Sequence, residues 1–491
     1  MARPPASRRD PAARSRHVVR RLSRHRRARH ARLQLGARVN DSSASAAASP
    51  ALSAIGGVRP SRMAVLFLVM LVAAAGNTAM QSILPAIGTR LGVPDWWVAL
   101  AFSWSALLWV VSAPRWAAMS DRRGRRALMA LGLIGFASSM LLCGLALYAG
   151  LAGWIGAGVT FIAFALFRSL YGALGSAAPP AVQAYVAART PRIHRTAAMA
   201  LIASSFGLGT VIGPAVAPFL VFPVVGLAGP LFAFAGFGIA VFVALRIVLP
   251  NDDPRFAARS AVVGYPSSGG GALAVEDDDD EDAVAGGNAP HLRPASRALG
   301  WNDPRTRPWL LAGLLGGHAQ AIVFGIIGFV VLDRLGLRGD PGAAVAPTGI
   351  VLLAGAGATL LAQWGLIPAL SIGPRASILW GAALALAGSI VLTFAGGLLG
   401  MVNGIAIASL GFGLFRPGFT AGVSLAVRRS EQDAVAGQVA STNGAAYIVG
   451  PTLGIALYTV SRAQHGWLAF ALIGGISAFL LAWGWKALRV D

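Results

Sequence analysis

The sequence predicts an all-α membrane protein with twelve transmembrane helices in two pseudo-symmetric six-helix bundles. Of its 491 residues, 56% are hydrophobic and only 12% are charged, whereas soluble domains carry about 25% charged residues. Apolar runs of about 20 residues recur from Met63 to Lys486, and each is long enough to cross roughly 30 Å of hydrocarbon. One long polar segment divides these runs into two groups of six.

The apolar runs define the expected spanning helices. They lie at residues 63–84, 96–114, 127–148, 157–187, 197–221, 229–249, 309–332, 346–369, 376–395, 399–427, 434–459 and 467–487. The fourth is longer than a bilayer requires and contains Pro179-Pro180. We therefore expect it to tilt, or to end near the two prolines with a short extension.

The polar segments divide the chain into four regions. Residues 63–249 and 309–487 are the two bundles, and residues 250–308 are a cytoplasmic linker with an acidic run at 276–282. That run lacks the glycine and the terminal glutamate of a calcium-binding EF-hand loop. Residues 1–62 are rich in Arg and Ala, have no apolar run, and are expected to be disordered.

The Arg-rich N-terminal region has four interpretations. We favour a misassigned start codon, followed by a cytoplasmic tail held near anionic lipid and by a targeting presequence. Nucleic-acid binding is the least favoured, because no folded nucleic-acid-binding module accompanies the charge.

Arginine and lysine are distributed unevenly between the loops on the two sides. If the N-terminus is inside, the cytoplasmic segments carry most of them, and the outer loops carry only four: Arg90, Arg334, Arg338 and Arg462. Cytoplasmic loops are enriched in positive charge. We therefore expect a multi-pass protein of the cell (inner) membrane with both termini in the cytoplasm.

The expected second inner loop, residues 117–126, has the sequence AAMSDRRGRR. A carboxylate at a helix end can interact with the positive N-terminus of another helix. The segment resembles the loop 2–3 signature of the major facilitator superfamily, Gly-x-Leu-x-Asp-Arg-x-Gly-Arg-Arg, with Ala117 in place of the usual glycine. The resemblance implies a conformational gate formed by Asp121, Arg122, Gly124, Arg125 and Arg126.

In that family the aspartate of the signature pairs with the start of helix eleven and steadies the outward-facing state. Here helix eleven is expected to start at Ser430-Glu431-Gln432-Asp433, which has the pattern of an N-terminal capping box.

A second resemblance lies in helix four, where Arg168, Gly172 and Gly175 fit the pattern Arg-x-x-x-Gly-x-x-Gly. An arginine in hydrocarbon costs at least about 2.5 kcal/mol, so it should face the bundle interior or a water-filled cavity. The resemblance implies a part in proton transfer or anion contact. The alternative is a side chain that extends to the membrane interface.

A third resemblance lies in helix five, where Gly209, Gly213 and Pro214 match the antiporter motif Gly-x-x-x-Gly-Pro-x-x-Gly except at Ala217. Small residues four apart allow a neighbouring backbone to approach closely, and Ala354–Ala358 of helix eight is the expected partner. The resemblance implies export. The alternative is a packing seam without directional meaning.

The second half repeats the order of these motifs. Arg416 precedes Gly450 and Pro451, as Arg168 precedes Gly213 and Pro214, although the spacing is shorter. Two related six-helix bundles around a central site are the architecture expected of a rocking transporter.

None of the 19 acidic residues is expected in mid-membrane. The cavity candidates are instead Asn77 and Gln81 in helix one, and His318 and Gln320 in helix seven. His318 is either a proton relay or a hydrogen-bonded packing residue. A neutral, zwitterionic or anionic substrate then fits better than a cationic one, although the rings of Trp104 and Tyr171 could attract a cation.

The whole pattern resembles twelve-helix drug and tetracycline efflux proteins. It predicts a monomeric secondary active transporter that exports a small amphiphilic compound or drug by alternating access, in exchange for protons, without a cofactor or metal. Uptake or facilitated transport of a metabolite, and a non-transporting sensor or scaffold, are the alternatives. No phosphate-binding loop, metal-ligand cluster or nucleophile–base set suggests an enzyme. The substrate, the direction and the coupling ion stay open.

Overall fold

The computed structural model of the chain describes residues 58–190, 192–250, 300–427 and 431–488, apart from some side chains within these ranges. The predicted tail up to residue 57 and the linker at 251–299, with its acidic run, lie outside the described residues. So does Ser430, the first residue of the expected capping box.

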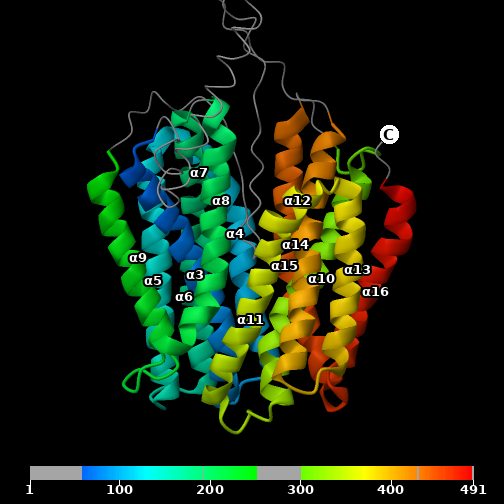
Figure 1. Ribbon diagram of the computed structural model, residues 1–491. Helices are drawn as coiled ribbons and strands as arrows, with labels where there is room; N and C mark the ends of the chain where they lie inside the picture. Colours follow the sequence, from blue (N-terminus) through cyan, green and yellow to red (C-terminus); the bar gives the residue numbers. More distant parts are fainter. Residues whose placement is uncertain (1–57, 191, 251–299, 428–430, 489–491) are drawn as a thin grey trace, which may run out of the picture. The chain divides into compact units, whose positions relative to one another are not determined.

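Two groups of helices make up the described chain, and the members of each group stand together (Figure 1). The first half comprises α3 (Pro60–Arg90), α4 (Asp95–Arg123), α5 (Arg125–Leu151), α6 (Ala157–Ala173), α7 (Ala178–Arg189), α8 (Arg192–Val216) and α9 (Gly229–Val248). The second half comprises α10 (Arg307–Arg334), α11 (Val345–Leu360), α12 (Ile367–Leu370), α13 (Pro374–Phe394), α14 (Leu398–Leu425), α15 (Gln432–Val460) and α16 (Trp467–Ala487).

These helices form the twelve predicted spans. Span four consists of α6 and α7 joined by a 3-10 turn at Gly175–Ala177, so it breaks just before the two prolines. Span eight consists of α11, a π-helix at Leu361–Leu366 and α12. Among the described residues, 11 segments are long and apolar enough to cross a membrane. The twelfth span is α15, which has 29 residues.

Several helices begin earlier than the apolar runs indicate, and two of them show why. The first starts at Pro60 rather than at residue 63, and the seventh starts at Arg307 rather than at residue 309. Each has a proline in its first two positions. Proline suits the start of a helix because its φ angle is already helical and its missing N–H would have no partner there.

The expected second inner loop is almost entirely helical. The second helix continues past residue 114 to Arg123, and α5 begins at Arg125, so Gly124 alone separates them. Its φ is +86°, a conformation that glycine adopts readily because it has no Cβ. The signature glycine is therefore explained by a tight connection between two long helices.

Apolar side chains cover the outside of the helices as well as the inside. Phe394 is 82% exposed and Leu166 is 63% exposed, whereas Trp309 and Phe419 are buried in a core cluster of the second half. Exposed apolar side chains suit a surface that faces lipid hydrocarbon.

In both halves, a glycine in the fifth helix of the half allows close packing against the first helix of that half. A Cβ added to Gly213 of α8 would lie 2.2 Å from the carbonyl oxygen of Ala75 in α3. A Cβ added to Gly450 of α15 would lie 2.7 Å from the Cβ of Ala321 in α10. Span five thus packs closely on span one, and span eleven on span seven, as expected of two related bundles.

The predicted partner of the helix-five glycines is wrong. Gly209 and Gly213 approach α3, whereas Gly355, at the centre of the Ala354–Ala358 segment, approaches Ser409 of α14. Span eight meets span five elsewhere, where a Cβ on Gly349 would lie 2.7 Å from the carbonyl oxygen of Pro214. Composition identified both small-residue segments, but small residues in several helices offer several possible pairings.

Candidate functional site

A central cavity of about 80 Å³ lies between α3, α4, α6 and α8 of the first half and α10 and α15 of the second. This volume suits only a few ordered water molecules, each of which takes about 30 Å³ in the liquid. The polar side chains that line it are Asn77, Thr78, Gln81, Ser105, Arg168, Tyr171, Thr210 and Tyr447. The first half supplies all of these except Tyr447.

Among the described residues that line the cavity, Arg168 is the only charged one, and it is 1% exposed. Its Nη2 donates a hydrogen bond to Oδ1 of Asn77. Its guanidinium carbon lies 4.4 Å from the ring centroid of Tyr171 and 5.5 Å from that of Phe102. Asn77 and Arg168, two candidates from different helices, thus meet at one wall of the cavity, and Gln81 lines it as well.

The other candidates in this group lie elsewhere. Gly172 faces α4, where an added Cβ would lie 2.5 Å from the carbonyl oxygen of Ser105. Gln320 is buried and lines a smaller pocket of about 10 Å³ in the second half, together with Arg416 and Asn443. Tyr447 lines both pockets, so the arginine of the second half has its own polar surroundings next to the central cavity.

His318 is half-buried in α10 and does not line the central cavity as the structure describes it. Its Nδ1 lies 2.7 Å from the carbonyl oxygen of Leu314 one turn earlier. Because a carbonyl oxygen only accepts, Nδ1 carries the hydrogen in this contact. The sequence shows that His318 belongs to the seventh helix, but it does not show which face of that helix lines the cavity. For this reason His318 is among the predicted cavity residues.

The gate motif is described in part. The side chains of Asp121 and Arg122 lie outside the described residues. Arg125 is 3% exposed, and Nη2 of Arg126 donates to the carbonyl oxygen of Arg246 at the end of α9, at 2.6 Å. Arg126 therefore connects the start of the third span to the end of the sixth.

The side chains of Ser430 and Asp433, which would form the expected capping box of helix eleven, lie outside the described residues, but Glu431 between them is described. This residue occupies the N-cap position of α15 without a side-chain capping bond. Its carboxylate instead accepts two hydrogen bonds from Arg305, each of 3.0 Å, and Arg305 also pairs with Asp303 at 2.8 Å. A charged partner from another segment competes with the backbone for this carboxylate.

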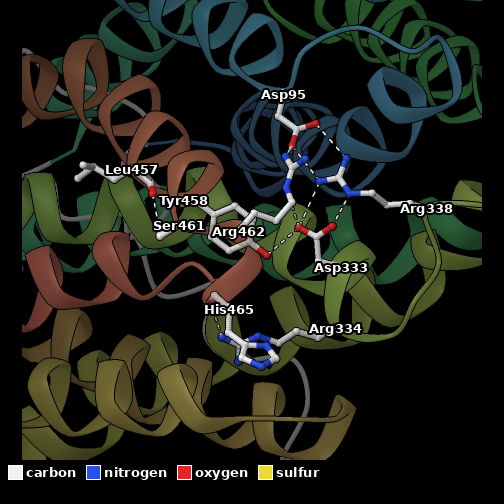
Figure 2. A network of polar contacts seen from close by, with 9 residues as sticks. All are labelled: Asp95, Asp333, Arg334, Arg338, Leu457, Tyr458, Ser461, Arg462 and His465. Atoms are coloured by element: carbon white, nitrogen blue, oxygen red, sulfur yellow. Dashed lines mark hydrogen bonds and ion pairs between the residues drawn. The ribbon is translucent and has the colours of Figure 1, made fainter.

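A set of side chains that the sequence did not single out connects the two halves at the predicted outer end (Figure 2). We call it the outer ion-pair cluster, and its members are Asp95, Asp333, Arg338, Tyr458 and Arg462. Asp95 belongs to the first half, at the start of α4, and the other four belong to the second half.

Asp95 is the centre of the cluster and is 6% exposed. Arg338 donates to both of its carboxylate oxygens, at 3.2 and 2.8 Å, and Arg462 pairs with the same carboxylate. Both arginines also pair with Asp333, which accepts a 2.9 Å hydrogen bond from the Tyr458 hydroxyl. Two carboxylates and two guanidinium groups thus balance each other across the halves.

Burial alone would lower the pKa of Arg338, but its hydrogen bonds to Asp333 and Asp95 outweigh this and raise the pKa above its ordinary value. Arg338 therefore stays charged within the cluster at neutral pH. The sequence feature that could have indicated this cluster is the small number of arginines in the outer loops, because two of these four, Arg338 and Arg462, belong to it. Another of the four, Arg334, donates instead to the backbone carbonyls of Ala395 and His465.

Comparison with known proteins places the chain in a family. A sequence model described as Major Facilitator Superfamily matches residues 66–451. A relative named "Multidrug resistance protein MdtG" from Citrobacter koseri is 28% identical over 157 residues, which are 31% of this chain and 36% of the relative. The protein of the same name from Proteus mirabilis is 28% identical over 145 residues, or 28% of this chain and 33% of the relative. The matched region thus spans only about a third of these relatives.

Solved structures show the same fold at low sequence identity. A bacterial homolog to the human lysosomal transporter Spinster, inward-facing and unoccupied, has a TM-score of 0.64 at 14% identity, with 88% of this chain and 98% of that chain covered. A D-xylose-proton symporter also has a TM-score of 0.64 at 14% identity, covering 87% and 97%. Together with the matched family model and the two six-helix halves, these findings show that the chain belongs to the Major Facilitator Superfamily.

Proposed function

We propose that this transporter exports a small amphiphilic compound by alternating access, in exchange for protons. The observation that carries the proposal is the central cavity, which both halves line and which combines one buried arginine with amide, hydroxyl and aromatic groups. The name of the relatives from Citrobacter koseri and Proteus mirabilis, multidrug resistance protein, supports export of drug-like compounds. The antiporter-like motif at Gly213-Pro214 supports the same direction.

Alternating access requires the outer ends of the halves to separate and rejoin. In this proposal the outer ion-pair cluster holds them together while the cavity exchanges its content with the inner side. The chain would then work as a monomer in the cell (inner) membrane, with both termini in the cytoplasm, as the distribution of arginine predicts.

Export is tested with a drug-susceptibility panel in a host that lacks its own pumps. Expression of the transporter should raise the inhibitory concentration of at least one amphiphilic compound, and inverted vesicles should accumulate that compound when energised. An Asp121→Asn variant at equal membrane abundance is the control. Accumulation in right-side-out vesicles instead would show uptake, and no movement in either would favour a sensor or scaffold.

The coupling proton has three candidate positions: Asp121, Arg168 and His318. Arg168 does not release its proton near neutral pH, so it would act by tuning a neighbour. The His318→Gln variant tests the histidine, because its side chain can still hydrogen-bond but cannot titrate. A changed pH–rate profile would assign the proton to His318. An unchanged profile, with an Asp121→Asn variant that exchanges substrate but does not concentrate it, would assign it to Asp121.

A further inference from the structure

A groove runs along the seam where α4 of the first half packs against α15 of the second half. We call it the lateral groove, and its volume is about 520 Å³, within the range of roughly 300–1,000 Å³ that is usual for sites of drug-sized ligands. Six of its lining side chains are exposed, and the groove therefore opens to the apolar outer surface, which suits lipid hydrocarbon. They are Leu100, Trp104, Leu107, Val449, Leu453 and Ala456.

The lining of the lateral groove suits a hydrocarbon chain. Among the described residues that line it, none is charged. The hydroxyl groups of Ser103 and Thr452 bond each other at 2.9 Å, and Nε1 of Trp104 donates to Ser169 at 2.8 Å. A charged headgroup placed here would lose its bonds to water without gaining equivalent ones, which is costly. The chemistry therefore favours an unbranched alkyl chain.

The lateral groove and the central cavity lie on two sides of the same pair of helices. Phe102 and Pro451 line the cavity, and the residues directly after them, Ser103 and Thr452, line the groove. The hydrogen bond between these two hydroxyl groups thus closes the seam between the two spaces. Bonds between neutral groups are weaker than charge-assisted ones, so the seam is held less strongly than the outer ends are by the ion pairs of Asp95.

We propose that the lateral groove binds the alkyl chain of an amphiphile dissolved in the bilayer, and that this chain enters the central cavity when the Ser103–Thr452 contact opens. The source is the bilayer because the exposed lining is apolar and belongs to the lipid-facing surface. The second part rests on the proposed function, since it gives the exported amphiphile a route from the lipid into the cavity.

An undecanol that carries a diazirine at its methyl end tests the site in the full-length protein, reconstituted in phosphatidylcholine vesicles. After illumination, mass spectrometry locates the residues to which the probe is attached. Attachment in the lateral groove should saturate with probe concentration and be lost when excess 1-undecanol competes. Attachment around Ala471, which is exposed on α16, should rise in proportion to the probe in the lipid.

Two results would overturn the proposal. One is attachment in the groove that does not saturate, which would mean that the groove is filled like any other lipid-facing surface. The other is no attachment in the groove, which is expected if a second copy of the chain covers it.

Two tryptophan substitutions locate the site. Ala456→Trp should lower attachment in the groove roughly fivefold or more, because the indole takes the space of the chain. Ala471→Trp is the matched control and should leave this attachment at the wild-type level. Ala456 lies four residues before the end of α15, and Ala471 lies four residues after the start of α16, so both stand near the predicted outer end. Equal attachment in the two variants would contradict the proposed site.

A third substitution tests the seam. Thr452→Val keeps the shape of the side chain and removes the hydroxyl group, so attachment at Phe324 in the cavity should rise about threefold or more, the effect of one neutral hydrogen bond. Thr459→Val is the control, because Thr459 is exposed on the same helix and lines neither space. Ser103→Ala keeps the test decisive if Thr452→Val does not fold. Unchanged attachment at Phe324 in a folded variant would overturn the route.

Export is judged separately in inverted vesicles. If the probe attaches in the groove and the cavity as expected but no compound crosses the membrane, the site and the seam stand and export falls. If a compound is exported equally well by the wild type and by Ala456→Trp, export stands and the route from the lipid falls.

Discussion

The two ends of the helical halves use their charges differently. At the predicted outer end, Asp95 of the first half pairs with Arg338 and Arg462 of the second half. At the predicted inner end, Arg305 pairs with Asp303 and Glu431. Arg305 and Asp303 lie just before α10 and Glu431 lies at the start of α15, so no residue of the first half takes part. Among the described ion pairs, therefore, those of Asp95 connect the halves and those of Arg305 do not.

Burial increases the contrast between the two sets. The Asp95 side chain is 4% exposed, whereas the Arg305 side chain is 42% exposed. Exposed ion pairs contribute little because water and salt screen them. Breaking a buried pair is much more costly, since it leaves a desolvated charge. In this conformation, breaking the ion pairs of Asp95 to separate the outer ends therefore requires more electrostatic work than breaking the ion pairs of Arg305.

The largest expected effect concerns the inner end. Asp121→Asn should leave membrane insertion and abundance near those of the wild type but abolish nearly all transport. The substitution keeps the size of the side chain and removes the charge expected to interact with the start of α15. Vesicle transport normalised to membrane abundance measures it. Transport at the wild-type rate would mean that the charge of Asp121 at the inner end is not essential. Only the outer end would then depend on its charges.

The next effect concerns the outer end. Asp95→Asn leaves two arginines with one carboxylate and should favour outer opening by about 2 kcal/mol, roughly thirtyfold in the ratio of the two states. Distances between spin labels at Trp154 and Gly339, in a variant without Cys143, report the separation of the halves. We expect a new population at longer distance.

The control for this experiment is Asp340→Asn, which removes an exposed acid close to Arg338 in sequence. Its distance distribution should match that of the wild type. If both variants behave alike, the outer ion-pair cluster does not hold the halves, and the contrast between the ends is lost.

A smaller effect is expected within the first half, where packing rather than charge joins α8 to α3. Gly213→Ala should lower stability by about 1–3 kcal/mol, because its Cβ would overlap the Ala75 carbonyl. Gly357→Ala is the matched control, since no atom lies within 4 Å of its added Cβ. It should have no destabilising effect, as alanine is the better helix former. Thermal unfolding in detergent compares the two, and equal losses would contradict the close packing.

The smallest effect is expected at Arg305. Its side-chain hydrogen bond holds the pKa of Asp303 below the ordinary 3.8, so the pair stabilises the folded state above that pH and loses its contribution as pH falls through the lowered pKa. Arg305→Gln should cause a slight decrease in unfolding temperature at pH 6 and none at strongly acidic pH. A decrease as large as that of Asp95→Asn at pH 6 would remove the contrast between the two ends.

Much of the candidate site followed from composition within single helices. Arg168 was placed in the bundle interior because a charge in hydrocarbon requires polar surroundings, and it is buried at the cavity wall. His318 and Gln320 were assigned to the same cavity, yet only their helix was evident from the sequence. In helices that are apolar on all sides, the pattern does not show which face meets a neighbour.

The sequence by itself determined the number, order and approximate limits of the spanning helices, the family motifs and the repetition of the halves. These depend on local properties: bilayer thickness fixes the length of an apolar run, and proline and glycine mark its ends. The tertiary structure alone decided that Asp95 meets Arg338, 243 residues away, that Asn77 meets Arg168, and that α8 packs on α3. Between helices in lipid the hydrophobic effect favours no particular partner, so close packing and polar contacts make the choice.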